Sequence, residues 1–107
     1  MSDFDNVPVG DIPDDAVILD VREDYEWAAG RIAGARHIQL QDVAAQAASI
    51  DRETPVVFYC RTGARSGMAT DAFRKAGYDA YNLGGGLEEW AAGGRPLEPE
   101  GGTVAAH

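Results

Sequence analysis

An apolar run, a short polar loop and a helical repeat follow one another between Pro55 and Gly77, and this order restricts the fold more than any other part of the chain. The run at residues 55–59 is β-branched and aromatic, which is typical of a buried strand in a parallel sheet. Alanine and phenylalanine then recur at helical spacing over residues 66–76, and Gly77 is a typical helix stop. Ligands of open α/β sheets bind just beyond the carboxyl ends of the strands. The loop between this strand and this helix is therefore the expected place of a functional site.

This loop carries Cys60, the only cysteine of the chain. The thiolate is the reactive form of cysteine, and an ordinary thiol with a pKa of about 8.5 is only about 3% ionised at pH 7. Lowering that pKa by about 2 units takes roughly 2.7 kcal/mol. A helix N-terminus supplies about 0.3–1 kcal/mol, whereas one arginine at about 4 Å adds a few kcal/mol at an effective dielectric constant of about 20. Arg61 and Arg65 flank the loop, and Gly63 lets successive backbone amides point inward as an anion nest.

Two interpretations of Cys60 are open. A lone cysteine at the end of a buried strand is most often a small, inert apolar residue. The two arginines, the glycine and the start of a helix favour instead a nucleophile at the base of an anion-binding loop. We therefore predict that Cys60 is catalytic.

The remaining elements alternate between short strands and short helices. Residues 16–19 form a second buried strand, which leads into Asp20 and Arg22. If the strands are parallel, these two side chains lie at the same end of the sheet as Cys60, where a structural ion pair is favoured over a direct functional role. The other predicted elements are a weak strand within residues 4–12, a helix at 24–29, a strand at 36–38, an alanine-rich helix at 41–50, a strand at 78–83 and a helix from 87.

Three consecutive glycines, residues 84–86, follow the last predicted strand. A phosphate-binding loop would need a Lys and a Ser or Thr, which are absent from this stretch. We interpret the glycines as a close backbone approach to the loop of Cys60.

The alternation of strands and helices predicts an α/β sandwich with a mostly parallel sheet. At 107 residues the chain is long enough for one domain with its own core. We expect this domain to cover residues 1–100, and we expect residues 101–107 to be a flexible tail.

Composition argues against several classes of protein. A single cysteine allows no internal disulfide, no cysteine-rich zinc site and no internal dithiol redox cycle. No apolar run approaches the roughly 18 residues of a membrane span, and the N-terminus has no signal-peptide pattern, so we expect a cytoplasmic protein. The net charge of −9 argues against nucleic acid and anionic membranes as partners.

Four stretches of the sequence resemble the rhodanese family, specifically its single-domain members. They are residues 20–23 (DVRE), 30–38 (GRIAGARHI), 59–66 (YCRTGARS) and 83–90 (LGGGLEEW), followed by Gly94 and Pro96. The resemblance implies a three-layer sandwich of about five mostly parallel strands with helices on both faces. It also implies that Cys60 is a sulfur-carrying nucleophile. By the same resemblance, the substrate-binding residues are Arg61, Thr62, Gly63, Ala64 and Arg65, and the supporting residues near the site are Asp20, Arg22 and Ser66.

The enzyme implied by this resemblance is a thiosulfate sulfurtransferase that works by a ping-pong scheme. The Cys60 thiolate would take the outer sulfur of a donor such as thiosulfate, and a second nucleophile would remove it from the persulfide. The partners would be a small anionic sulfur donor and a thiol, cyanide or protein acceptor, with no metal and no other cofactor. Family members that use thiosulfate often carry Lys where this chain has Thr62, which leaves the preferred donor open. Monomer and homodimer are both open.

Three alternatives stand beside this interpretation. A phosphatase or arsenate reductase also holds a cysteine under an anion-binding loop, but it needs five residues between Cys and Arg, whereas four separate Cys60 from Arg65. A non-catalytic rhodanese-like binding module generally lacks the cysteine. A dedicated persulfide relay would keep Cys60 and deliver sulfur to one protein partner, which the sequence does not distinguish from a free enzyme.

Overall fold

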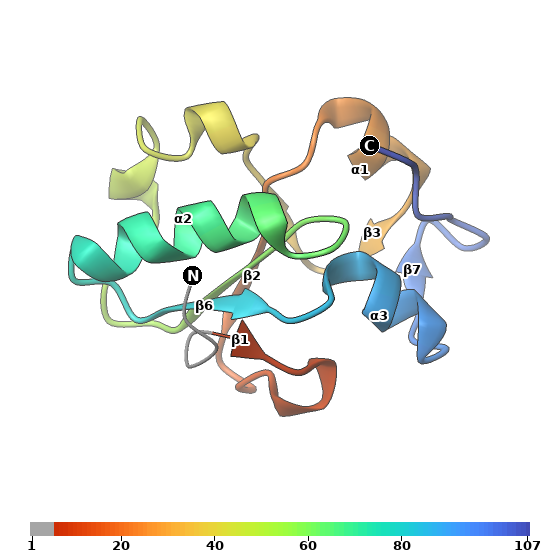
Figure 1. Cartoon of the computed structure of the whole chain (residues 1–107), viewed down its shortest axis with the longest axis horizontal. Coiled ribbons are helices and arrows are strands. Elements are labelled where there is room, and N and C mark those ends of the chain that lie inside the picture. Colours follow the sequence, from red (N-terminus) through yellow and green to blue (C-terminus); the bar gives the residue numbers. More distant parts are fainter. Residues whose placement is uncertain (1–5) are drawn as a thin grey trace.

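Five parallel strands form the central sheet of the protein, and the computed structural model describes residues 6–107 (Figure 1). The strands lie side by side in the order β1-β6-β5-β2-β4, and each neighbouring pair is parallel. Their bounds are β1 Asn6–Val7, β2 Val17–Asp20, β4 Arg36–His37, β5 Val56–Tyr59 and β6 Ala80–Leu83. The predicted five-stranded parallel sheet is therefore confirmed.

Over residues 6–107, three α-helices and three short 3₁₀ helices connect the strands. The α-helices are α1 Asp24–Ala29, α2 Ala64–Lys75 and α3 Gly86–Ala92. The 3₁₀ helices are η2 Val9–Asp11, η3 Leu40–Asp42 and η4 Ala47–Ser49. A second, antiparallel sheet pairs β3 Arg31–Ile32 with β7 Leu97–Glu98. Over residues 6–107, none of the helices has the length and apolar character that a membrane span requires.

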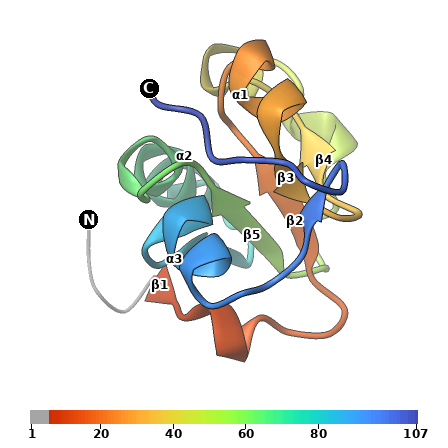
Figure 2. The same ribbon diagram turned by 90° about the vertical axis from the view of Figure 1, so that its right-hand side faces the viewer.

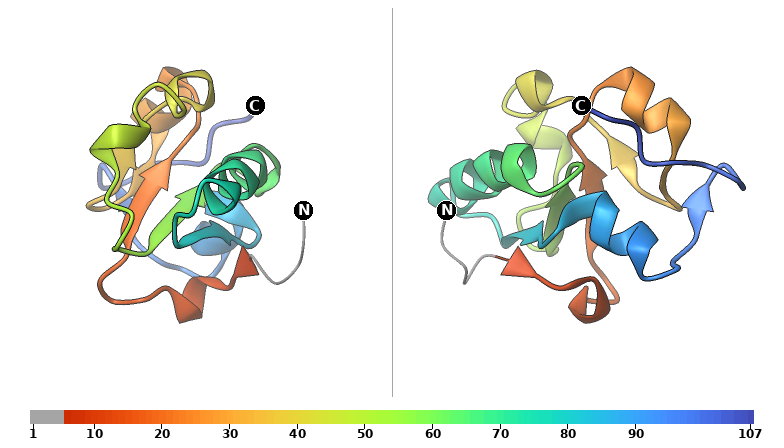
Figure 3. Two further views of the ribbon diagram at one scale, coloured as in Figure 1. Left: turned by 90° about the vertical axis from the view of Figure 1, so that its left-hand side faces the viewer. Right: turned by 45° about the vertical axis from the view of Figure 1, so that its right-hand side comes forward.

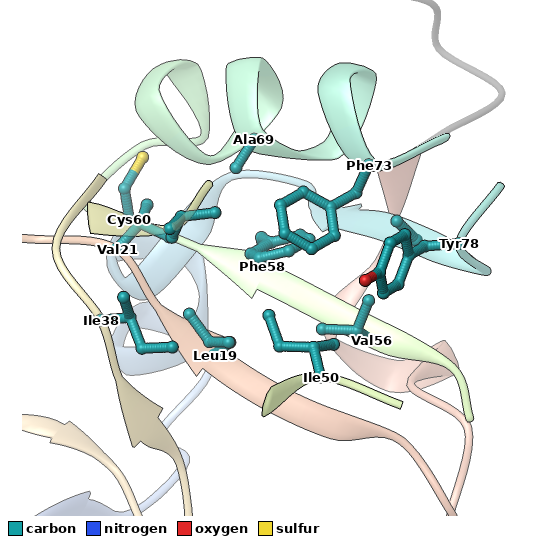
Figure 4. Packing of buried hydrophobic residues seen from close by; sticks show 12 residues of the cluster. Leu19, Val21, Ile38, Ile50, Val56, Phe58, Cys60, Ala69, Phe73 and Tyr78 are labelled. Atoms are coloured by element: carbon teal, nitrogen blue, oxygen red, sulfur yellow. The ribbon is translucent and has the colours of Figure 1, made fainter. Parts of the chain in front are cut away.

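Alternation along β5 divides the core into two layers, because successive side chains of a strand point to opposite faces of the sheet. Val56, Phe58 and Cys60 belong to the cluster that α2 covers with Ala69 and Phe73. Figure 4 shows this cluster, with Phe58 and Phe73 packed edge to face at 5.0 Å between ring centroids. The alternate residues Val57 and Tyr59 pack on the other face with Ile32 of β3, Leu83 of β6 and Leu87 of α3. The three-layer α/β sandwich is thus confirmed.

The carboxyl ends of the central strands meet at one edge of the sheet. Asp20 of β2 pairs in register with Tyr59 of β5, and the Val21 N–H donates to the Tyr59 carbonyl at 3.1 Å. The loop after β5 leads directly into α2 (Figure 3). The chain after β6 reaches the same edge, where the Leu87 N–H donates to the Cys60 carbonyl at 2.9 Å. Parallel pairing therefore brings the ends of β2, β5 and β6 together around Cys60.

The alanine-rich helix predicted at residues 41–50 is wrong. This segment consists of η3, a series of turns and η4, and the Gln46 N–H is shared between the carbonyls of Asp42 and Val43 at 3.2 Å each. Only Val43 and Ile50 are buried in the segment, so it lacks the continuous apolar stripe that docks a helix. A helix this short is marginal without such packing, whatever the propensity of alanine.

Both ends of the chain differ in detail from the prediction. The weak strand predicted within residues 4–12 is reduced to β1 and is followed by η2, while residues 4 and 5 lie outside the described part. The strand β7 has no counterpart among the predicted elements. Beyond it, the C-terminal segment runs beside α1 in Figures 1, 2 and 3. There the Thr103 N–H donates to Ala29 at 2.8 Å and the Tyr25 hydroxyl donates to Ala106 at 3.0 Å. The flexibility of residues 101–107 stays a prediction.

Candidate active site

Cys60 is the first residue beyond β5, at the carboxyl edge of the sheet. Its side chain is buried, with 1% of the residue exposed. In Figure 4 the sulfur points away from the apolar cluster and toward the beginning of α2. The sulfur thus lies at the base of the loop that joins β5 to α2.

Hydrogen-bond donors surround this sulfur. The Gly63 N–H donates to the Cys60 Sγ at 3.1 Å, and the Ser66 hydroxyl lies 3.4 Å from it. Burial alone raises the pKa of the Cys60 thiol, because a charge is poorly solvated in the interior. Hydrogen bonds from the Ser66 hydroxyl and from the backbone N–H groups of Ser66, Gly63 and Thr62 outweigh burial, so the pKa of Cys60 lies below its ordinary value. The loop therefore stabilises the nucleophilic form of the cysteine.

Two glycines give the loop this path. Gly63, the residue before α2, has a φ of 111°, a conformation that side chains with a Cβ rarely adopt, and this turns its N–H toward the sulfur. Gly86 opens α3 with a φ of 61°, and a Cβ on it would lie 2.5 Å from the Arg61 carbonyl oxygen. The predicted close approach of the glycine segment to the Cys60 loop is confirmed. It lets the amides of Leu87 and Glu88 donate to the carbonyls of Cys60 and Arg61.

Ser66 connects the sulfur to the last strand of the sheet. Its fully buried hydroxyl has one hydrogen, which it shares between Cys60 Sγ and Asn82 Oδ1. The Asn82 amide nitrogen donates to the Gly63 carbonyl at 3.1 Å and to Asn6 Oδ1 at 2.9 Å. Asn82 is itself 2% exposed. This network fixes Ser66 and Gly63, the two residues whose side chain and backbone contact the sulfur.

The two arginines of the loop are paired with glutamates. Arg65 makes a two-point contact with the fully buried carboxylate of Glu26 in α1, at 2.7 and 2.9 Å. Arg61 lies with its Nε 2.7 Å from Glu88 Oε2 in α3. The hydrogen bonds described for the sulfur come from Ser66 and the backbone, not from a guanidinium. The hydrogen bonds that lower the pKa of Cys60 thus come from Ser66 and the amides, while Arg65 acts through its charge, because the pKa of Arg65 is raised by Glu26 and also by the nearby Cys60 thiolate.

Asp20 and Arg22 form the structural ion pair that the sequence favours. Both side chains are fully buried, and their closest contact, from Arg22 Nη2 to Asp20 Oδ2, is 2.6 Å. Burial lowers the pKa of Arg22, but the hydrogen bond and charge of Asp20 outweigh it and the pKa is raised. Arg22 also donates to the Gly30 carbonyl at 2.7 Å, which ties the end of β2 to the end of α1. The pair supports the helix that carries Glu26.

The predicted site residues divide by position. Cys60, Thr62, Gly63 and Ser66 contribute to the sulfur environment, whereas Ala64 is the exposed first residue of α2. Sequence reasoning missed Glu26, Asn82 and Glu88. A capping box at the start of α1 could have drawn attention to Glu26, whose carboxylate accepts a hydrogen bond from the Glu23 N–H at 3.1 Å. Asn82 and Glu88 carry no such local pattern, because their partners lie far away in the sequence or depend on tertiary packing.

The profile of the family described as "Rhodanese-like domain" matches residues 9–93. The thiosulfate sulfurtransferase GlpE of Pseudomonas aeruginosa is 38% identical over 76 residues, which are 70% of this chain and 69% of GlpE. A sulfurtransferase of Allochromatium vinosum is 36% identical over 90 residues, or 82% of this chain and 84% of that protein. YqhL of Bacillus subtilis is 41% identical over 76 residues, but the match is 70% of this chain and only 60% of YqhL.

The fold is also similar to solved structures. A rhodanese-related protein of Thermoplasma volcanium superposes with a TM-score of 0.77 and 27% identity, over 80% of this chain and 86% of that one. This likeness supports the α/β architecture of the chain.

Proposed function

This chain belongs to the rhodanese-like domain family, whose curated members include sulfurtransferases, and we propose that it transfers a sulfane sulfur through a persulfide on Cys60. The donor is a small anion such as thiosulfate, and the acceptor is a thiol, a carrier protein or, in the assay, cyanide.

In the first half-reaction the Cys60 thiolate attacks the outer sulfur of thiosulfate. A new S–S bond forms between Cys60 Sγ and that sulfur, the original S–S bond breaks, and its electron pair leaves with sulfite. The thiol must first lose its proton to solvent, and the lowered pKa of Cys60 favours this loss at neutral pH. No general base is required, since hydrogen bonds already stabilise the thiolate.

In the second half-reaction an acceptor nucleophile attacks the terminal sulfur of the persulfide. The S–S bond breaks, and Cys60 leaves as the thiolate that the loop stabilises. The backbone N–H groups of Thr62, Gly63 and Ser66 form hydrogen bonds with the Cys60 sulfur. They therefore stabilise the Cys60 thiolate both when it attacks the donor and when it leaves the persulfide. Neither half requires a metal or an organic cofactor.

One observation carries the proposal: the only cysteine is buried at a strand end, and hydrogen-bond donors of the loop are directed at its sulfur. An inert structural cysteine has no need of the Gly63 amide at 3.1 Å or of a lowered pKa. These features support a reactive sulfur over a non-catalytic binding module.

The test is intact mass spectrometry of the reduced protein after incubation with thiosulfate and removal of the excess. We expect the parent protein to gain one sulfur atom, a Cys60→Ser variant to gain none, and cyanide to release the added sulfur as thiocyanate. If the parent gains no sulfur from thiosulfate or from another donor such as mercaptopyruvate, the proposal fails. Turnover with cyanide or small thiols at a rate comparable with loading supports a free enzyme, and turnover with a protein acceptor alone supports a relay.

A further inference from the structure

Each arginine of the Cys60 loop already has a carboxylate partner. Arg65 is held by the buried Glu26, and Arg61 lies against Glu88 on the first turn of α3. The Arg61–Glu88 contact is an ion pair and not a well-formed hydrogen bond, because Arg61 Nε is buried and has no hydrogen-bond partner within residues 6–107. The side chains of Arg61 and Glu88 are 38% and 44% exposed, so a ligand can reach both. The loop offers an incoming anion no unopposed guanidinium.

From this pairing we propose that Glu88 is a specificity-determining residue that lowers the efficiency of doubly charged sulfur donors relative to singly charged ones. The proposal rests on the proposed sulfurtransferase function and names the class of donor for the same site.

The position of Glu88 relative to the loop is fixed by backbone contacts. Its N–H donates to the Arg61 carbonyl at 3.1 Å, and Leu87 donates to the Cys60 carbonyl at 2.9 Å. The close approach at Gly86 makes these contacts possible. The carboxylate of Glu88 is thus attached, through α3, to the same two residues that begin the reactive loop.

Charge balance then opposes a dianion. The four side chains Arg61, Glu88, Arg65 and Glu26 sum to zero, the reacting thiolate adds one negative charge, and the whole chain carries −9. A unit charge within about one Debye length of a donor changes its binding by about two- to threefold per donor charge at a water-like dielectric constant. Because the effect multiplies with each donor charge, a neutralised Glu88 helps a dianion by about four- to ninefold and a monoanion by about two- to threefold.

Two sulfur donors that differ in charge but react by the same chemistry allow the effect of charge to be measured separately. Thiosulfate carries two negative charges, and methanethiosulfonate (CH₃SO₂S⁻) carries one. In both, the Cys60 thiolate forms a bond to the outer sulfur, and the S–S bond breaks with its electron pair on the leaving group, which is sulfite or methanesulfinate. The experiment measures kcat/KM for each donor, with cyanide as acceptor, in the parent protein and in Glu88→Gln. Glu89→Gln is the matched control, because it makes the same charge change on the next residue of α3, which has no described ion pair with the loop.

We expect Glu88→Gln to raise kcat/KM for thiosulfate about two- to threefold more than for methanethiosulfonate, while Glu89→Gln leaves the ratio of the two donors unchanged. An unchanged ratio in Glu88→Gln, or an equal change in both variants, overturns the inference, since the effect would then be absent or one of net charge alone. If the parent protein takes sulfur from neither donor, the sulfurtransferase proposal itself fails, which separates the two failures.

Discussion

Removal of the Ser66 hydroxyl tests the origin of the reactivity of Cys60. The hydroxyl is fully buried and lies 3.4 Å from Sγ, and it is the leading stabilising contact of the thiolate. Hydrogen bonds to charged groups contribute about 1.5–3 kcal/mol, and a bond to sulfur at this length belongs near the lower limit. Since 1.36 kcal/mol corresponds to one pKa unit, Ser66→Ala should raise the pKa of Cys60 by about one unit.

The direction of the pKa change depends on whether the hydrogen bond stabilises the thiol or the thiolate of Cys60. A hydroxyl that donates to the thiolate favours the charged form, so its loss raises the pKa and lowers the thiolate fraction at pH 7. We expect iodoacetamide alkylation of Ser66→Ala to be about five- to tenfold slower at pH 7 and to approach the parent rate at high pH. The pH profile of the parent should have its midpoint below the ordinary cysteine value, because the pKa of Cys60 is lowered in the fold.

Thr70→Val is the matched control for this measurement. Thr70 lies one turn further along α2, is as buried as Ser66, and donates to the Ser66 carbonyl at 2.9 Å without a described contact to the sulfur. If Thr70→Val shifts the alkylation midpoint as far as Ser66→Ala does, helix distortion and not the hydroxyl–sulfur bond sets the pKa. If Ser66→Ala leaves the midpoint unchanged, the Ser66 hydroxyl does not stabilise the thiolate, and the reasoning is refuted.

Three further predictions concern the surroundings of the loop and the C-terminal segment. Gly86→Ala should lower the free energy of unfolding, measured in urea, by at least about 2 kcal/mol more than Gly94→Ala does. Both glycines have a positive φ, but only at Gly86 would a Cβ collide with backbone atoms. Equal losses in the two variants would contradict this reasoning. Glu26→Gln should cost about 2–3 kcal/mol at neutral pH, because it leaves the partly exposed Arg65 without its buried partner. The pKa of Glu26 is lowered in the fold, since the hydrogen bond and charge of Arg65 outweigh its burial, so this loss should shrink as the pH falls through that value; a constant loss in acid would exclude the ion pair as its cause. Amide hydrogen exchange should be faster over residues 101–107 than in β5 if the tail is flexible, and protection equal to that of the core would show that it is docked.

The sheet and the location of the site could be predicted from local patterns alone. The run that becomes β5 is apolar on both faces, and this feature identifies a central strand of a parallel sheet without reference to any partner. Once the strands are parallel, the residues after β2 and β5 must share an edge, so the proximity of Asp20 to Cys60 follows from topology. Predicting the sheet and the position of the reactive loop therefore required no knowledge of contacts between residues far apart in the sequence.

The partners of the arginines could not be predicted in the same way. Arg65 and Glu26 are 39 positions apart, and their contact depends on how α1 packs against the start of α2. Arg61 and Glu88 meet only because Gly86 allows α3 to approach the loop. A sequence pattern shows that an arginine is present, but its effective charge is set by the carboxylate that packing brings to it.

The error at residues 41–50 has a similar origin. Alanine propensity is a local quantity, and the segment's two buried residues, Val43 and Ile50, fix the backbone through tertiary contacts. Tyr78 adds to this by donating its hydroxyl hydrogen to the Ala47 carbonyl at 3.0 Å. Tertiary packing therefore overrides propensity in this stretch.

Asn6 lies in an edge strand only two residues long, yet its side chain accepts a hydrogen bond from Asn82, which in turn holds Ser66 and Gly63 around the sulfur. Short edge strands are among the first parts of a fold to open locally. Each opening of β1 would release one side of Asn82 and change the environment of the nucleophile, although no residue of the loop has moved. A change that loosens β1 would therefore alter the reactivity of Cys60 from a distance, and the alkylation rate of that single thiol would report how firmly the first strand is attached.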